Sequence, residues 1–159
     1  MLISNLDFST DISCDDEDVL AYTDVDEEGD DLEKIHFCPI AYEMPNLESV
    51  DCGALDSYPS EKIDTFSRVV LHEITHGSNV GPESELGAQI IDVTNTIDKM
   101  KAYGFERAHA LVTERPGQDV VNADNYALMS LDAWVSWTCT PRENRDAWAS
   151  FFPDAPPDY

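Results

Sequence analysis

The stretch that decides the fold runs from Ser60 to His76, SEKIDTFSRVVLHEITH, and contains neither glycine nor proline. Its apolar residues recur at helical spacing, which places one side of the segment against a core. Ser60 is a suitable N-cap, and Gly77 is a natural C-terminal stop. The sequence therefore predicts a helix over 60–76. The residues expected on its buried face are Ile63, Phe66, Val70 and Ile74.

The end of this helix carries the motif HExxH, from His72 to His76. Residues four apart lie on one helix face about 6 Å apart, so both imidazoles can bind one zinc ion. Glu73 points about 100° away from His72, from where it can reach a water on the zinc and act as a general base. The motif predicts a zinc site. The alternative is an exposed helix with two unconnected histidines.

The class of such a site depends on its third ligand. The metzincin pattern requires Gly and His where this chain has Asn79 and Pro82, so that class is excluded. His109 lies within the segment ERAHALV, where a partly buried, hydrogen-bonded histidine is expected rather than a ligand. We therefore expect a carboxylate. The candidates are Asp92, Asp98, Glu106, Glu114, Asp119 and Asp124.

Other segments predict a small sheet and two more helices. Alternating residues over 34–40 indicate a short strand with Ile35 and Phe37 inward and His36 exposed, ended by Pro39. Helices are expected over 105–114 and 122–138. Their expected inward residues are Phe105, Ala108, Leu111 and Val112 in the first, and Leu128, Leu131, Trp134 and Val135 in the second.

The two ends of the chain differ from its middle in composition. Residues 15–33 carry eleven acidic side chains and no basic one, which predicts a solvated, mobile segment without a site. The last nine residues, FFPDAPPDY, are too rich in proline to be helical. The interpretation is an acidic segment at 1–33, one domain at 34–150 and a proline-rich tail at 151–159.

Charge narrows the class of partner. With 33 acidic and 9 basic residues among 159, the formal net charge is -24. Such a chain lacks the basic footprint of a nucleic-acid binder, and its apolar runs fall short of the roughly 20 residues that cross a bilayer. A macromolecular substrate or partner is therefore expected to be basic.

The number and spacing of the cysteines indicate the redox compartment in which the protein folds. The chain has four, Cys14, Cys38, Cys52 and Cys139, without any CxxC spacing. Two disulfides in an oxidising compartment are the simpler interpretation, although the N-terminus shows no signal peptide; the alternative is four buried thiols in the cytosol. Cys38 and Cys52 bracket a short segment, so we expect them to pair and leave Cys14 to Cys139.

Three matches in order resemble the aspzincins, the fungal deuterolysin-like and peptidyl-lysine metalloendopeptidases. They are VVLHEITH at 69–76, Tyr103-Gly104 followed by FERAHAL, and NADNYAL at 122–128, spanning 69–139 in all. The resemblance implies a mostly helical fold with a small sheet, one zinc ion, secretion and cleavage of peptide bonds. In this family HExxH is followed by an aspartate ligand.

For the aspartate ligand, the resemblance leaves two positions. Asp98 has the short TID context of the family motif, but the adjacent lysines offer it an ion pair. Asp92 lies among apolar residues, where an unpaired carboxylate is costly to bury and zinc would be a favourable partner, so we expect Asp92. Tyr103 is similar to the family tyrosine that stabilises the oxyanion, or else it packs before a turn. Asn122 and Asp124 are expected to cap their own helix.

The resulting prediction is an α+β, predominantly helical, zincin-type single domain whose HExxH helix forms the active site of a zinc-dependent metalloendopeptidase. It would be an extracellular monomer that holds one Zn²⁺ and acts on basic proteins or peptides. The alternative is a secreted zinc-binding protein of the same fold without proteolytic activity. The expected metal ligands are His72, His76 and Asp92, and the expected catalytic residues are Glu73 and Tyr103.

Overall fold

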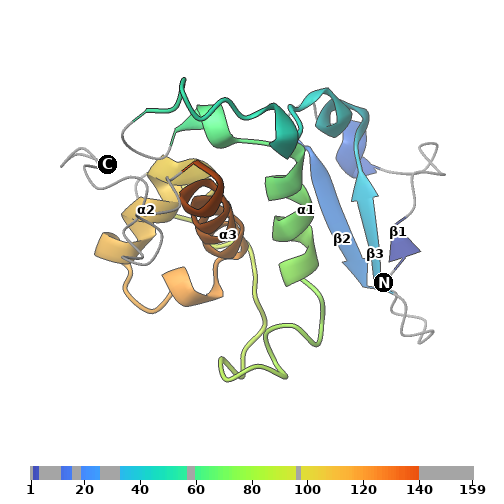
Figure 1. Ribbon diagram of the computed structural model, residues 1–159. Coiled ribbons are helices and arrows are strands. Elements are labelled where there is room, and N and C mark those ends of the chain that lie inside the picture. Colours follow the sequence, from blue (N-terminus) through green and yellow to red (C-terminus); the bar gives the residue numbers. More distant parts are fainter. Residues whose placement is uncertain are drawn as a thin grey trace.

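A computed structural model describes residues 2–3, 12–15, 19–25, 33–56, 60–95 and 98–139. The described chain is α+β, with a small sheet followed by three longer helices (Figure 1). The helices are α1 (Phe66–Thr75), α2 (Gly104–Glu114) and α3 (Ala123–Cys139). Helix α1 lies between the sheet and α3, so it contacts both halves of the fold. The expected α+β class is confirmed.

The sheet has the strand order β1-β3-β2, with β3 (Glu33–Phe37) in the middle. Strand β1 (Leu2–Ile3) runs parallel to β3, and β2 (Ala21–Val25) runs antiparallel to it. Within β3, Ile35 and Phe37 are buried against α1, as their alternation predicts. The strand ends at Phe37, before Pro39 as expected, and Pro39 opens a 3-10 helix over Pro39–Glu43.

Strand β2 corrects the expectation for the acidic segment 15–33. Residues 21–25 are not an unpacked stretch but pair along their whole length with β3. Between acidic neighbours, the short run from Ala21 to Val25 carries enough β-branched and aromatic side chains to pair and to cover α1. The high acidic content of residues 15–33 as a whole gave no sign of the five-residue strand within them.

Helix α1 begins later than expected. Ser60 caps a separate 3-10 helix (Glu61–Ile63) by accepting from the amide of Lys62, and the chain is extended at Thr65 before α1 starts. The helix ends as predicted, with His76 as its C-cap and the Gly77 amide donating to the Ile74 carbonyl. The motif from His72 to His76 therefore occupies the last turn of a regular helix.

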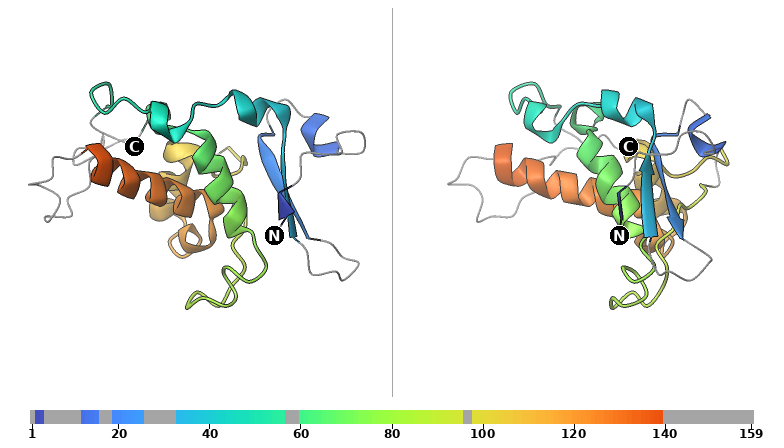
Figure 2. Two further views of the ribbon diagram at one scale, coloured as in Figure 1. Left: turned by 45° about the vertical axis from the view of Figure 1, so that its right-hand side comes forward. Right: turned by 90° about the vertical axis from the view of Figure 1, so that its right-hand side faces the viewer.

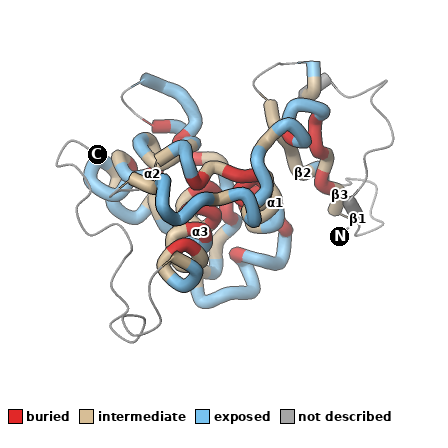
Figure 3. The backbone as a smooth tube through the Cα atoms, turned by 45° about the horizontal axis from the view of Figure 1, so that its top comes forward, coloured by how far each residue is buried: buried red, intermediate tan, exposed pale blue. Residues whose placement is uncertain are grey.

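Helices α2 and α3 lie within one residue of the predicted bounds. Ala108, Leu111 and the expected α3 residues Leu128, Leu131 and Val135 are buried, and Trp134 packs against the cluster of Ile63, Leu131 and Val135. The expectation that Val112 faces inward is wrong, since this residue is 47% exposed. Figure 3 shows the buried residues concentrated on β3 and between the helices.

The two expected disulfides form, but the pairing is different. Cys14 bonds to Cys38, and Cys52 bonds to Cys139. The segment between Cys38 and Cys52 does not close on itself. It runs from the sheet across the top of α1 to the end of α3 (Figure 2), which carries Cys52 to the last residue of that helix.

The expected boundaries at residues 33/34 and 150/151 stay predictions, and the expected tail at 151–159 lies outside the described residues. In the described part of the chain, no helix combines the length and apolar character that crossing a membrane requires.

Candidate metal centre

Helix α1 places two imidazoles side by side. His72 and His76 lie one turn apart, with ring centroids 5.0 Å apart and Nε2 atoms separated by 3.2 Å. His72 is buried and His76 is half-buried. Because both Nε2 atoms point the same way, the helix alone creates a two-ligand edge.

The third side chain comes from the segment after the loop 77–90. Oδ1 of Asp92 lies 3.0 Å from Nε2 of His72 and 3.2 Å from Nε2 of His76. Ligand atoms about 2.0–2.1 Å from a tetrahedral zinc are separated by about 3.3 Å, close to all three observed distances. Among the described residues, His72, His76 and Asp92 form the group that could hold a metal ion.

When both imidazoles are neutral, hydrogen bonds at the other ring nitrogens leave these three atoms facing one another without a hydrogen between them. Nδ1 of His76 donates to the carbonyl of Ile90 at 3.1 Å, and Nδ1 of His72 donates to Asp124 at 3.0 Å. Both Nε2 lone pairs therefore point at Oδ1 of Asp92, which is buried and lacks a hydrogen-bond partner of its own. A cation or a proton must lie among three such acceptors, so these residues fit a metal ion.

Without a metal, a proton takes that position. Burial lowers the pKa of His72, but the neighbouring carboxylates of Asp124 and Asp92 favour the protonated ring, outweigh burial and raise the pKa to about 9. Burial likewise opposes ionisation of Asp92, yet the two histidines hold the pKa of that carboxyl far below its usual range. Metal binding must therefore displace a proton from the site.

Glu73 is buried next to the ligands. Its Oε2 accepts a hydrogen bond of 2.8 Å from the Thr23 hydroxyl, which also lies 3.1 Å from the Glu73 carbonyl. Burial raises the pKa of Glu73. Thr23 belongs to β2, and sequence reasoning missed it because the acidic segment was assigned no site.

Tyr103 approaches the site from the residue before α2. Its hydroxyl donates to Oδ2 of Asp92 at 2.8 Å, and its ring meets that of His72 edge to face at 5.4 Å. Burial first and then the Asp92 charge raise the pKa of Tyr103, so the phenol stays protonated. In this arrangement Tyr103 holds the Asp92 carboxylate through Oδ2 and leaves Oδ1 facing the histidines.

Asp124 corrects the expectation that it caps its own helix. It is fully buried, and its Oδ2 accepts from the amide of Gly104, the first residue of α2, at 2.5 Å. Its Oδ1 accepts from His72 and, at 2.6 Å, from Nη1 of Arg68. Asp124 therefore caps α2 and orients His72, as carboxylates behind metal-binding histidines commonly do.

The remaining candidates lie elsewhere. Asp98 accepts from Arg107 at 2.9 Å and from the amide of Met100, which lower its pKa, so its partner is an arginine rather than the expected lysine. His109 is exposed on α2 instead of partly buried. Of the carboxylates predicted as possible ligands, those outside the metal group are Asp98, Glu106, Glu114, Asp119 and Asp124.

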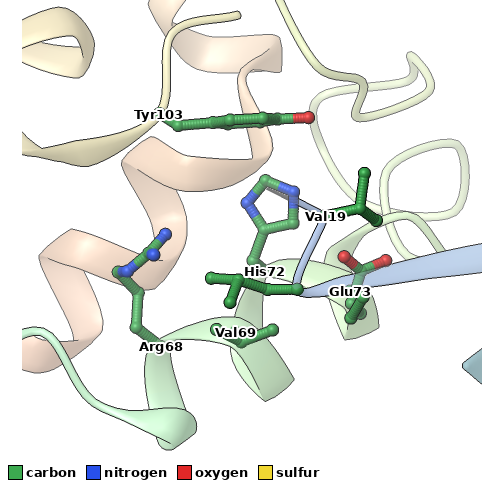
Figure 4. A pocket seen from close by; sticks show the side chains of 8 residues that line it. Val19, Arg68, Val69, His72, Glu73 and Tyr103 are labelled. Atoms are coloured by element: carbon green, nitrogen blue, oxygen red, sulfur yellow. The ribbon is translucent and has the colours of Figure 1, made fainter. Parts of the chain in front are cut away.

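Two pockets open beside the three ligand atoms. One of about 270 Å³ contains His72, Glu73 and Tyr103, with Tyr103 across the opening from the α1 side chains (Figure 4). A second of about 580 Å³ reaches His76 and Asp92. Both pockets are lined by β2 and by the residues just before it. The residues common to the two are Val19, Ala21, Glu73 and Tyr103.

Comparison of this chain with family models, with curated proteins and with solved structures finds no match. The site is therefore interpreted from its own geometry.

Proposed function

We propose that this chain is a zinc-dependent metalloendopeptidase of the aspzincin type. The observation that carries the proposal is the convergence of His72, His76 and Asp92 on one point, with the carboxylate of Glu73 lining the pockets beside it. Two neutral imidazoles and one carboxylate are a ligand set of catalytic zinc sites. The zincin-type fold and a monomeric state belong to the same proposal.

When bound, zinc would polarise a peptide carbonyl and lower the pKa of a water molecule. Glu73 accepts a proton from the attacking water and passes it to the amine nitrogen that leaves as the C–N bond breaks. Thr23 holds Glu73 in place during this transfer. Tyr103 donates to the oxyanion that develops on the carbonyl, once its hydroxyl turns from Asp92.

The proposed substrates are basic proteins or peptides, because a net charge of -24 attracts cationic chains. We propose an extracellular location, supported by two disulfides that join all four cysteines.

A zinc-binding protein without proteolytic activity is the second candidate. The contact between Tyr103 and Asp92 favours it, because a hydroxyl that stays on Oδ2 cannot serve an oxyanion. The two candidates predict the same metal content and differ in turnover.

Metal analysis of the pure protein together with casein cleavage tests the proposal. One zinc per chain with cleavage that a chelator abolishes is the expected result, whereas zinc without cleavage of any substrate favours the second candidate. Asp92→Ala should lose zinc, and Asp98→Ala is the matched control, since that carboxylate pairs with Arg107 outside the site. Zinc lost from the control but kept in Asp92→Ala would overturn the ligand assignment.

A further inference from the structure

We propose that Arg68 is a positioning residue of the metal centre, which holds Asp124 where that carboxylate can orient His72. The inference rests on the proposed function. Arg68 is one helical turn before His72 on α1, and both side chains emerge on the same face of the helix (Figure 4). Both contact the carboxylate of Asp124 on α3.

The contacts of Arg68 link the start of α1 to His72 through Asp124. Nη1 of Arg68 donates to Oδ1 of Asp124 at 2.6 Å, and that same oxygen accepts from Nδ1 of His72 at 3.0 Å. With Gly104 on the other oxygen, three donors from two helices meet one carboxylate. Removing Arg68 would leave Asp124 held by His72 and by one backbone amide.

Charge makes Arg68 more than a packing residue. Asp124 is fully buried, and a buried carboxylate left as an anion without a compensating positive charge is costly. In the zinc-loaded protein His72 is a neutral ligand. Arg68 then supplies the positive charge that contacts Asp124 directly, and the anion in turn makes His72 a stronger ligand.

Asp64 fixes the other side of Arg68. Its Oδ1 accepts from Nε of Arg68 at 2.6 Å, and its Oδ2 lies 3.4 Å from Nη2. The planar guanidinium is therefore engaged by two carboxylates at once, a geometry that a lysine cannot reproduce. Asp64 lies two residues before α1 begins, so this pair also ties the helix start to the site.

The test measures zinc affinity by competition with a chromophoric chelator, and site geometry by the visible absorption of the Co²⁺-loaded protein. Arg68→Met should bind zinc 10–100-fold more weakly, the usual effect of losing a group behind a ligand. Its cobalt bands should shift, because the direction of His72 changes. Arg68→Lys, which keeps the charge but not the fork, should recover part of the affinity. Zinc affinity and cobalt spectra equal to wild type would overturn the proposal.

Arg107→Met is the matched control, because Arg107 also pairs with an aspartate, Asp98, but outside the site. It should bind zinc as wild type does. A purely structural Arg68 would lower the melting temperature of metal-free Arg68→Met and leave its zinc affinity and cobalt bands unchanged, which counts against the proposal. The weakening in Arg68→Met and in Asp124→Asn should not add in the double variant, since both act through one contact.

If Arg68→Met does not fold, Asp64→Asn decides, because that side chain is 31% exposed and its loss is milder. A several-fold weaker zinc affinity with the same direction of cobalt shift supports the proposal, and wild-type values overturn it. Wild-type protein that binds no zinc is a different result, which overturns the proposed function and this inference with it.

Discussion

The hydroxyl of Tyr103 donates a hydrogen bond of 2.8 Å to Oδ2 of Asp92. An antiparallel bridge between Thr94 and Lys101 joins the segments that carry these two residues, and the Lys101 ammonium also donates to the Asp92 carbonyl. Tyr103 thereby sets the rotation of the carboxylate and leaves Oδ1 to the two histidines.

Tyr103→Phe should change two quantities. Loss of the hydrogen bond to Asp92 should weaken zinc binding by about tenfold. With zinc saturating, loss of an oxyanion donor should lower kcat by about 100-fold. Steady-state cleavage of a peptide at several zinc concentrations separates the effects. A saturated kcat equal to wild type would confine Tyr103 to holding Asp92.

Glu73→Gln should keep zinc and lose turnover, because the amide cannot accept the proton of the attacking water. A loss of about 10²–10⁴-fold in kcat is expected. His72→Ala should lose both zinc and turnover. Zinc content by mass spectrometry and cleavage of casein measure the two, and equal proteolysis by wild type and Glu73→Gln would sink the enzymatic proposal.

Zinc affinity should rise with pH up to about 9. Below that pH His72 is protonated in the metal-free protein, so each zinc bound must displace a proton and affinity falls about tenfold per pH unit. For the same reason the His72 contacts stabilise the metal-free fold fully below its unfolded pKa of about 6.5, and that stabilisation is lost as pH rises toward 9. Calorimetry at pH 7 in buffers of different ionisation enthalpy should report about one proton released, and zero would contradict the prediction.

The two disulfides should contribute unequally. They span 24 and 87 residues, and in the chain-entropy model the longer loop stabilises by about 1 kcal/mol more. Cys52→Ser with Cys139→Ser should therefore lower the denaturation midpoint further than Cys14→Ser with Cys38→Ser. Peptide mapping under non-reducing conditions checks the pairing first. Recovery of a peptide linking Cys38 to Cys52 would contradict it.

Ionic strength should affect substrate choice. At low salt, lysine-rich or protamine-like substrates should be cleaved faster than acidic ones, because the net charge of -24 concentrates cations near the surface. The preference should shrink as salt shortens the Debye length from about 10 Å at 0.1 M. Indistinguishable kcat/KM values for basic and acidic substrates at low salt would show that the charge does not select substrates.

The sequence by itself determined what depends on local spacing. Residues four apart on a helix must share a face, so the motif from His72 to His76 specified two converging imidazoles before any tertiary contact was known. The alternation in β3 and the apolar periodicity of α2 and α3 located those elements for the same reason. The apolar frame of Asp92 also distinguished it from Asp98, because burial of a carboxylate requires a partner.

Tertiary structure decided what depends on contacts between distant segments. Thr23 reaches Glu73 across 50 residues, and Asp124 reaches His72 across 52, so neither contact leaves a periodic signal in the sequence. The pairing of cysteines expected from the sequence was wrong, because loop length alone favours bonds between near neighbours. The path of the chain over α1 instead brings Cys52 to the end of α3. Local spacing specified the two histidines, and the packing of β2 and α3 on α1 supplied the groups that hold one of them and the neighbouring glutamate in place.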